Sequence, residues 1–495
     1  MTNRLSAACL AALPEEVARP TYDRGKLDVG VVHLGVGAFH RAHQAVYTEA
    51  ALAAGDRRWG ILGASLRSAD TRDALRPQEF LYTLAERDAA GERLQVIGAL
   101  RDVMVAPEDP GRLLETMARA SVKIVSLTVT EKGYCHDPAT GALREDHPDI
   151  LHDLANPARP RTAIGFLAEA LARRRAARLS PFTVLTCDNL PSNGHTVQRV
   201  LARFAALRDA DLGRFVADAV ACPCTMVDRI VPATTAEDRE RTAAALGALD
   251  AWPVATEPFT QWVIEDRFCQ GRPDWSIYGA EFVADVAPYE TMKLRLLNGA
   301  HSSLAYLGYL AGYATVAEAM SDPDLSAFVT ALMTEDALPT LRVPAGADVQ
   351  TYIEALLERF RNPALKHRTR QIAMDGSQKL PQRLLGTIRD RLAEGAPIAR
   401  PALSIAAWMR YVTGIDEHGG PIDVSDPLRD DLRRRADAAG LDARRLTPAL
   451  LDVAAIFGED LPRDRRFAAA VESALGSLIR RGTRETLRGI VRSPG

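Results

Sequence analysis

Three side chains that can move or polarise a proton occur together in YETMKLRLLNGAHSSLAYLG, residues 289–308: Lys293, Asn298 and His301. The other residues are mostly apolar, which predicts a largely buried helix in which these three lie within an arc of about 140°. An apolar setting disfavours a charged ammonium and lowers its pKa, so Lys293 can serve as a general acid or base. The amide and the imidazole can polarise and orient an oxygen. This set suits proton transfer at an alcohol or carbonyl group.

Lysine is rare in this chain: only six of the 61 Lys and Arg residues are lysines. An ammonium can lose its proton near neutral pH when it is desolvated, whereas a guanidinium cannot. The rarity therefore favours a chemical role for Lys293. Chance placement, a lysine that reaches the surface and a hydrogen-bonded core histidine remain alternatives at this stage.

A second chemical signal is the glycine turn in residues 29–55, where an apolar run is followed by Gly35 and Gly37 and then by an alanine-rich stretch. This order predicts a strand, a tight turn and a helix, an arrangement that holds a dinucleotide pyrophosphate. His40 occupies the position of the third glycine in the usual GxGxxG pattern, so a glycine turn without a ligand is an alternative. The next apolar run ends near Ser65 and Arg67. An acidic residue at this position would select NAD, but none is present there, so NADP is also possible as the cofactor.

Further apolar runs alternate with helical stretches, which predicts an α/β sheet with ligands at the ends of the strands. We expect strands in LYTLAE, RLQVIGAL, KIVSLTVTEKGY, FTVLTCDNLPSNG and CPCTMVDRIVPATT. Three strand ends are rich in polar residues, among them Thr130 and Glu131, Asp188 and Asn189, and Val227 and Asp228. Turn-forming Asn and Asp residues that bond their own backbone are the alternative interpretation.

Beyond about residue 285 the pattern becomes helical. We therefore predict a dinucleotide-binding domain over residues 1–285 and a mainly helical substrate and catalytic domain over residues 286–495. A loop-like segment, residues 362–385, gathers Lys366, His367, Arg368, Arg370 and Lys379. It is equally consistent with a solvated basic face and with a site for an anion.

The composition of the chain limits which partners, cellular compartment and metal sites can be expected. The formal net charge is -3 and no basic field is evident, which argues against nucleic acid as a partner. We find neither a signal segment nor an apolar run long enough to cross a membrane, and we expect a cytoplasmic protein. The six scattered cysteines fit a reducing compartment. Cys222-Pro-Cys224 is interpreted as packing rather than as a metal or redox pair, and no metal site is predicted.

At this point the sequence resembles the polyol-specific long-chain dehydrogenases, a family that includes mannitol 2-dehydrogenases and fructuronate reductases. The resemblance spans nearly the whole chain and is carried in order by GVGAFHRAHQ, SLTVTEKGY, CDNLPSNG, TMVDRIVP, KLRLLNGAHS and MDGSQKLPQRLL. The segments EKGYC, FTQWVIEDRF, GRPDW and HRTRQIAMDGSQKLPQ look most like the fructuronate reductases. The family fold is an extended Rossmann domain followed by a helical domain.

The resemblance also implies roles for individual residues. Lys293 would be the general acid and base, Asn298 and Asn189 the oxyanion hole, and His301 the group that orients a substrate hydroxyl. Glu290 and Glu131 would form a proton relay to solvent, and no metal would be needed. We predict substrate contacts from Asp228, Lys379, Arg368 and His367, and cofactor contacts from Gly35, Gly37, Phe39, Ser65, Arg67, Thr130 and Val227.

The predicted reaction is the reversible, NAD-dependent reduction of D-fructuronate to D-mannonate, with NADP not excluded. A related activity on mannitol and fructose, on another polyol or on tagaturonate is an alternative. So is a catalytically silent nucleotide-binding sensor, although a sensor has no use for a proton-transfer lysine. We expect a small-molecule sugar acid or polyol as substrate, and a monomer or small homo-oligomer.

Overall fold

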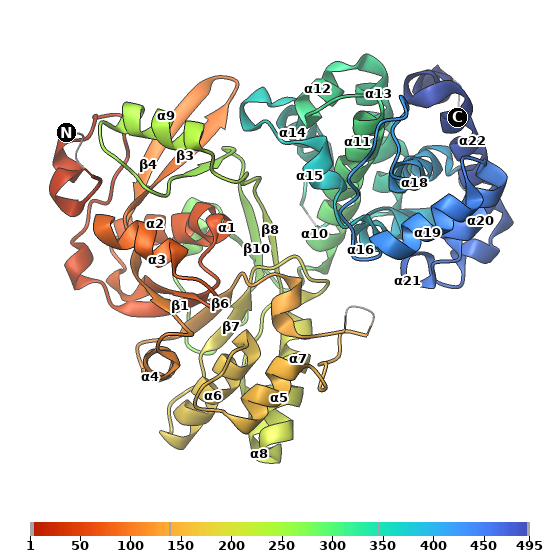
Figure 1. Cartoon of the computed structure of the whole chain (residues 1–495). Helices are drawn as coiled ribbons and strands as arrows, with labels where there is room; N and C mark the ends of the chain where they lie inside the picture. The colour runs from red at the N-terminus through yellow and green to blue at the C-terminus, as the bar shows by residue number, and fades with distance from the viewer. Residues whose placement is uncertain (1–3, 138–139, 345, 493–495) are drawn as a thin grey trace. The chain divides into compact units, whose positions relative to one another are not determined.

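The computed structural model describes residues 4–137, 140–344 and 346–492. The chain divides into two compact units, Met1–Ala287 and Pro288–Gly495. We call them unit 1 and unit 2 and describe each by itself (Figure 1). The boundary predicted from the sequence follows residue 285.

Unit 1 contains a five-stranded parallel sheet in the order β5-β2-β1-β6-β7. Its strands are buried almost throughout, as expected when helices cover both faces of a parallel sheet. This arrangement confirms the predicted α/β, Rossmann-type fold class. The strands are β1 Val29–Leu34, β2 Gly60–Ser65, β5 Leu100–Val105, β6 Ile124–Leu127 and β7 Thr183–Thr186.

Helices connect these strands, and α6 shows how a helix of unit 1 is capped at both ends. In α6, Thr162 accepts a hydrogen bond from the Gly165 N–H at the N-terminus, and three arginines occupy the last turn, where they complement the helix dipole. The helices of unit 1 are α1 Ala38–Ala42, α2 Gln44–Ala53, α3 Asp70–Leu75, α4 Pro110–Ala118, α5 Pro148–Ala155, α6 Ala163–Ala176, α7 Asn193–Arg208, α8 Ala210–Ala219 and α9 Ala236–Leu246.

Two smaller sheets complete unit 1, and their strands were only partly predicted. One has the order β4-β3-β9, the other β11-β10-β8. Their strands are β3 Tyr82–Asp88, β4 Gly91–Ile97, β8 Thr225–Asp228, β9 Val254–Thr256, β10 Gln261–Glu265 and β11 Glu281–Val283. The strand predicted in RLQVIGAL is present as β4, but it ends at Ile97, and Gly98 separates it from β5. The N–H of Gly98 donates to Glu49 and its carbonyl accepts from Arg24, so neither group is left for a ladder.

Unit 2 is mainly helical, which confirms the second half of the predicted fold class (Figure 1). The first helix, α10 Ala287–Met292, is followed by α11 Gly299–Leu310, α12 Val316–Ser321, α13 Pro323–Ala331, α14 Val349–Arg361, α15 Thr369–Ala373, α16 Gly376–Leu380, α17 Gly386–Ala393, α18 Ala399–Val412, α19 Arg429–Ala439, α20 Ala443–Leu451, α21 Ala454–Phe457 and α22 Arg465–Arg492. Within the described ranges, no helix has the length and apolarity that crossing a membrane requires.

The core of unit 2 is built around α11 and α18, which pack on one another and on neighbouring helices. Every residue of α18 from Pro401 to Val412 is buried. Because α11 is anchored along most of its length in this core, its first turn is held in place. That turn directly follows the Lys293–Asn298 segment.

The prediction that residues 362–385 form a loop was wrong. Most of the segment lies in short helical pieces, namely Pro363–Leu365, α15, α16 and a π-helical turn at Pro381–Leu385. Asp375 adopts a left-handed backbone conformation with φ of 56°, which separates α15 from α16. Pro381 is tolerated because it stands at the start of its helical turn. The punctuating residues therefore divide this helical segment instead of preventing it.

One buried carboxyl group in unit 1 makes the stability of the fold depend on pH. Glu49 on α2 is 3% exposed, and its Oε2 accepts hydrogen bonds from the Tyr22 hydroxyl at 2.8 Å and the Gly98 N–H at 2.7 Å. Burial raises the pKa of Glu49 from about 4.5 to about 7, even though these hydrogen bonds act in the opposite direction. Between these values the folded chain holds a proton that the unfolded chain has released.

We predict that Glu49 lowers the free energy of unfolding as the pH rises from about 4.5 through about 7. The side chain introduced by Glu49→Gln cannot ionise. The free energy of unfolding of this variant, relative to that of the wild type, should therefore increase across this window, by about 3 kcal/mol at most. Urea unfolding at pH 5 and pH 8, followed by tryptophan fluorescence, measures this difference. Glu115→Gln, on the exposed side of α4, is the control. Parallel stabilities of wild type and Glu49→Gln at both pH values would contradict the prediction.

Candidate functional site

The segment that carries Lys293 and Asn298 is a π-helix, Lys293–Asn298, inserted between α10 and α11. The prediction of a regular helix with 3.6 residues per turn was therefore wrong at this point. In a π-helix the backbone bonds join residues five apart, and Lys293 and Asn298 are five apart. Their side chains consequently leave the helix on nearly the same side, closer in angle than a regular helix would place them. Single π-helical turns are frequent at functional sites.

A second π-helical turn, Pro381–Leu385, packs against the first. Gly299 permits the approach, because a Cβ atom at this position would stand 2.8 Å from the carbonyl oxygen of Arg383. Lys293 is only 7% exposed and Asn298 is partly buried. Glu290 lies three residues before Lys293 on α10 and is also partly buried. The segment thus presents a buried ammonium, an amide and a carboxylate within two turns of one helix.

His301, on the first turn of α11, lies among aromatic rings. The ring of Phe360 stacks on it with centroids 5.3 Å apart, and the ring of His367 meets it edge-on at 4.8 Å. Among the residues that the structure describes, the buried His301 Nε2 has no hydrogen-bond partner. A buried imidazole nitrogen that the protein leaves unsatisfied is suited to a hydrogen bond with a ligand hydroxyl.

The charges around His301 are positive. Burial first, and then His367, Arg383, Arg359 and Lys379, hold the pKa of His301 well below its ordinary value. Burial and the Lys379 charge lower the pKa of His367 to about 4. Both imidazoles are therefore neutral at pH 7. We call His301, Phe360, His367, Arg359, Lys379 and Arg383 the His301 cluster.

Two cations of the His301 cluster are fixed by hydrogen bonds. Lys379 Nζ donates to the carbonyl oxygens of Ile372 and Met374 at 3.2 and 2.5 Å, which holds the ammonium over the α15–α16 connection. Arg383 Nη1 donates to the hydroxyl of Ser302, the residue after His301, at 3.0 Å. These bonds reduce the motion of the side chains, so less conformational entropy is lost when they bind an anion.

Arg368, which we predicted to contact the substrate, is placed differently from His367 and Lys379. Its side chain is exposed, and its backbone precedes α15 and pairs with Thr315. The nearby Arg370 forms an ion pair with Asp423 on the surface. The segment 362–385 thus contributes both to a solvated basic face and to the His301 cluster, and the role of Arg368 stays a prediction.

In unit 1 the glycine turn after β1 has the predicted form. Gly35 has φ of +94°, and a Cβ atom there would stand 2.2 Å from the carbonyl oxygen of Thr128, so only glycine fits. Gly37 precedes α1, and apart from its neighbours in the chain the nearest described atom to the position of its Cβ is the Gly35 carbonyl oxygen, at 3.9 Å. A phosphate therefore has space to approach the backbone of this turn.

The missing third glycine is explained by a buried histidine pair. His40 stacks on His33 of β1 with ring centroids 3.5 Å apart and an interplanar angle of 15°. His33 Nδ1 is 2.8 Å from the Ser126 hydroxyl on β6, and its Nε2 is 2.9 Å from the Thr128 hydroxyl. Aromatic stacking here replaces the close contact between helix and strand that a glycine would give. Phe39 in turn stacks on His43, where α1 ends and α2 begins.

Asp188 holds together two of the polar strand ends. Its carboxylate accepts hydrogen bonds from the N–H groups of Val129 at 2.9 Å and Thr130 at 3.0 Å, and from the Tyr134 hydroxyl at 2.6 Å. Thr130 has φ of 64° and ψ of 164°, a strained conformation that these bonds stabilise. Burial raises the pKa of Asp188 while the three hydrogen bonds lower it. The next residues, Glu131 and Asn189, are both exposed.

Tyr134 is an organising residue that the sequence analysis missed, and Asp188 was named there only as part of a strand end. The polar pair Asp188-Asn189, which follows a buried strand, could have indicated both residues. It faces the turn that follows the neighbouring strand. The bond between Asp188 and Thr130 joins β7 to β6 at their carboxyl ends. Ligands bind at this edge in open α/β sheets.

The remaining predicted residues of unit 1 lie at two other strand ends. Val227 and Asp228 end β8 and are both 4% exposed, paired with Trp262 and Gln261 of β10. Ser65 ends β2 and is partly buried, whereas Arg67 is exposed. Beyond Arg67, the Ser68 hydroxyl donates to Asp70 at 3.0 Å, so a carboxylate lies just beyond this strand end.

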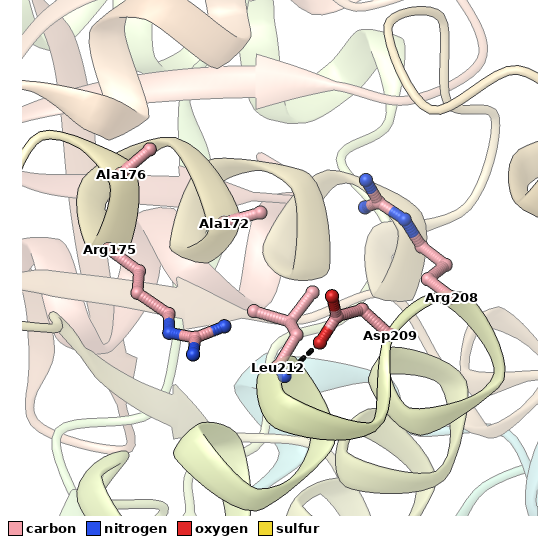
Figure 2. Close-up of a pocket in the computed structure, with 6 residues that line it drawn as sticks. All are labelled: Ala172, Arg175, Ala176, Arg208, Asp209 and Leu212. Carbon is pink, nitrogen blue, oxygen red and sulfur yellow. Dashed lines mark hydrogen bonds between the residues drawn. The ribbon is translucent and has the colours of Figure 1, made fainter.

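A surface pocket of about 410 Å³ lies elsewhere in unit 1, on α6, α7 and α8 (Figure 2). None of its lining residues was predicted to act in binding or catalysis. Asp209 points its carboxylate into the N-terminus of α8 and accepts from the Leu212 N–H at 2.8 Å, so this helix end is already capped. The lining residues are Ala172, Arg175, Ala176, Arg208, Asp209 and Leu212.

Comparison with known proteins identifies related sequences along the chain. Residues 29–277 match the mannitol dehydrogenase Rossmann domain, and residues 285–479 match the mannitol dehydrogenase C-terminal domain. D-mannonate oxidoreductase of Escherichia coli K12 is 48% identical over 480 residues, which cover 96% of this chain and 98% of that protein.

Two solved structures resemble the chain over nearly its full length. Mannitol 2-dehydrogenase of Pseudomonas fluorescens, in a ternary complex with NAD and D-mannitol, superposes with a TM-score of 0.91 at 41% identity, covering 99% of this chain and 100% of that one. A D-sorbitol dehydrogenase in substrate-free form superposes with a TM-score of 0.88 at 33% identity, covering 98% of this chain and 100% of that one.

We predict that the Lys379→Met variant raises the pKa of both His367 and His301, because it removes a positive charge that lowers both. The His367 pKa should rise from about 4 and stay below the ordinary value, since burial remains. Titration of the histidine ring resonances by NMR measures this change. Lys26→Met, at a lysine with an 81% exposed side chain in unit 1, is the matched control. Identical titrations of His367 in the wild type and in Lys379→Met would refute the electrostatic account of the cluster.

Proposed function

This chain belongs to the mannitol dehydrogenase family of oxidoreductases, which act on CH–OH groups, and from that premise we propose that it interconverts D-fructuronate and D-mannonate with NAD. The reaction reduces the ketone of fructuronate to the secondary alcohol of mannonate. The identity of 48% to the D-mannonate oxidoreductase of Escherichia coli supports this choice of substrate. The NAD in the related mannitol 2-dehydrogenase complex supports the choice of cofactor.

The observation that carries the proposal is the sign of the charge at the His301 cluster. Arg359, Lys379 and Arg383 all act on His301, and both imidazoles of the cluster are neutral. A uronate differs from a polyol or a ketose in its carboxylate, which favours a positive site. A hydrogen bond between a carboxylate and a guanidinium or an ammonium is charge-assisted and about twice as strong as a neutral one.

The residues at the glycine turn fit a dinucleotide. Gly35 must be glycine for the turn to form, and Gly37 leaves the backbone of the turn open to a pyrophosphate. NAD, when bound, supplies the hydride acceptor for alcohol oxidation and, as NADH, the hydride donor for ketone reduction. We assign contacts with it to Gly35, Gly37, Phe39, Ser65, Arg67, Thr130 and Val227. The exposed Arg67 would suit the extra phosphate of NADP, so the assay below compares NADH with NADPH.

Lys293 is assigned the proton transfer. As an acid it gives its proton to the oxygen that develops negative charge during reduction, and as a base it takes the hydroxyl proton during oxidation. Asn298 and Asn189 are assigned hydrogen bonds to that oxygen, which stabilise its developing charge. Glu290 and Glu131 return the proton to solvent. His301, neutral and with a buried nitrogen to offer, orients a substrate hydroxyl, and Asp228 completes the contacts with the sugar chain.

A panel of substrates tests the proposal directly. With NADH, the kcat/KM for D-fructuronate should exceed that for D-fructose by about 10- to 100-fold, the value of one charge-assisted hydrogen bond. D-tagaturonate and NADPH complete the panel, and both should be poorer than D-fructuronate and NADH. A preference for D-fructose would contradict the proposal in favour of a mannitol 2-dehydrogenase.

The origin of this preference can be tested in the same assay. Lys379→Met should lower the kcat/KM for D-fructuronate more than that for D-fructose, because only the first carries a carboxylate. Lys26→Met should leave both values as in the wild type. An equal loss with both substrates would mean that Lys379 supports the fold and does not select a uronate.

A further inference from the structure

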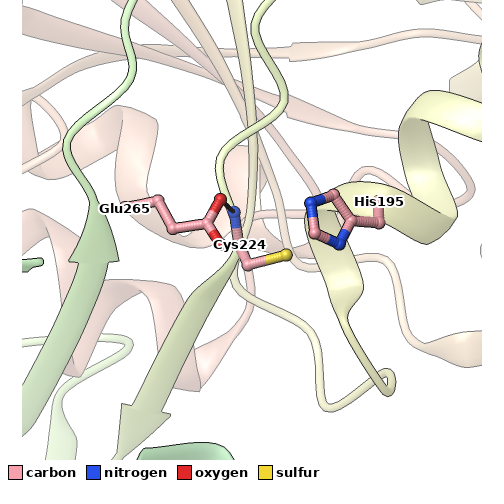
Figure 3. Close-up of side chains that lie close together, drawn as sticks. All are labelled: His195, Cys224 and Glu265. Atoms are coloured by element: carbon pink, nitrogen blue, oxygen red, sulfur yellow. Dashed lines mark hydrogen bonds between the residues drawn. The ribbon is translucent and has the colours of Figure 1, made fainter. Parts of the chain in front are cut away.

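We propose that unit 1 carries a binding site for a zinc-class divalent metal ion, formed by His195, Cys224 and Glu265. Their potential ligand atoms, an imidazole nitrogen, the thiol sulfur and a carboxylate oxygen, all lie within 4.8 Å of one another. Figure 3 shows the Cys224 sulfur pointing toward the His195 ring, with the Glu265 carboxylate on the other side of Cys224. None of the three has a part in the reaction proposed above.

The backbone holds two of these residues side by side. Cys224 directly precedes β8 and Glu265 ends β10, and these strands pair in antiparallel fashion. The Glu265 N–H donates to the Cys224 carbonyl oxygen at 3.0 Å, and the Cys224 N–H donates to the Glu265 carboxylate at 2.9 Å. The second bond uses one carboxylate oxygen, so the other oxygen can serve as a ligand.

The third residue is brought in by the first turn of α7. Gly194 allows this turn to lie against the chain before β8, because a Cβ atom there would stand 2.5 Å from the carbonyl oxygens of Cys222 and Pro223. The Asn193 side chain binds the backbone of Thr225 on both sides, accepting from its N–H at 2.9 Å and donating to its carbonyl at 3.0 Å. His195 follows immediately and is exposed, which leaves an entry path for an ion and room for a water ligand.

A thiolate, an imidazole and a carboxylate together select zinc or a similar metal. Magnesium and calcium prefer oxygen ligands alone. Zinc bonds of about 2.0–2.3 Å place the ligand atoms of a tetrahedral site roughly 3.3–3.8 Å apart, so the three groups need to close by about 1 Å. The exposed His195 side chain can make this adjustment.

No metal site is predicted from the sequence, and Cys222-Pro-Cys224 is interpreted there as packing. Metal-site motifs are recognised by close spacing along the chain, whereas these ligands come from three segments separated by 29 and 41 residues. A bound ion would tie α7 to β8 and β10, next to the Asn193 bonds that also reach the Thr186 and Asp188 carbonyls. We therefore expect the ion to stabilise unit 1 without taking part in hydride transfer.

Titration of the metal-free full-length chain with Co²⁺ tests the site. We expect one equivalent to bind with the near-ultraviolet charge-transfer band of a cobalt–thiolate bond, and Zn²⁺ to displace it. His195→Gln, a change at an exposed position, should weaken binding at least about tenfold, and Cys224→Ser should abolish the band. Matched controls are His418→Gln, at an exposed histidine in unit 2, and Cys9→Ser, at a partly exposed cysteine.

The outcomes that support the metal site differ from those that contradict it. Loss of the band in Cys224→Ser and weaker binding in His195→Gln, with both controls unchanged, would establish the site. Absence of stoichiometric binding, binding without a thiolate band, or equal binding by His195→Gln and the wild type would overturn it. The assay contains no sugar or NAD, so its outcome is independent of the proposed reaction.

Discussion

The relative placement of Lys293 and Asn298 in unit 2 depends on the π-helical segment Lys293–Asn298. One additional residue per turn brings Lys293 and Asn298 onto nearly the same side of the helix, while α11 continues into the core. The segment is supported by the second π-helical turn, Pro381–Leu385, which approaches closely only because residue 299 is glycine. The buried ammonium and the amide beside it are therefore positioned by packing rather than by a loop.

Electrostatics explains why histidine and lysine have different tasks here. Burial and the neighbouring cations keep His301 and His367 neutral, so they can accept or donate a hydrogen bond without carrying charge. The positive charge is left to Lys379, Arg383 and Arg359. A site of this kind favours an anion near a neutral hydrogen-bonding histidine, which is the chemistry of a sugar acid.

Much of the fold could be predicted from sequence because its signals are local. Buried apolar runs predicted the parallel strands β1, β2, β6 and β7 but not β5, and Gly35 and Gly37 predicted the turn after β1. The π-helical turns could not be predicted, because apolar periodicity does not distinguish backbone bonds to the fourth residue from bonds to the fifth. The division of RLQVIGAL at Gly98 depends on bonds from Glu49 and Arg24, which are distant in the chain.

The candidate site was predictable to a similar degree. The residue types Lys293, Asn298 and His301 indicated proton transfer, and the basic segment 362–385 was equally consistent with a solvated basic face and with a site for an anion. The sequence could not show which cations reach His301, or that Arg368 stays exposed, because the short helices of that segment arise from tertiary packing. The bond of Asp188 to the strained Thr130 and the stacking of His40 on His33 are likewise contacts between distant segments.

The central claim is that Lys293 gives up and takes back the proton of the reaction. The most direct measurement is the pH dependence of D-mannonate oxidation from pH 6 to 10, under conditions where chemistry limits the rate. We expect the rate to rise with pH through one inflection, and the Lys293→Met variant to lose turnover while it retains affinity for NADH. A flat profile in the wild type, or undiminished turnover in the variant, would contradict the account.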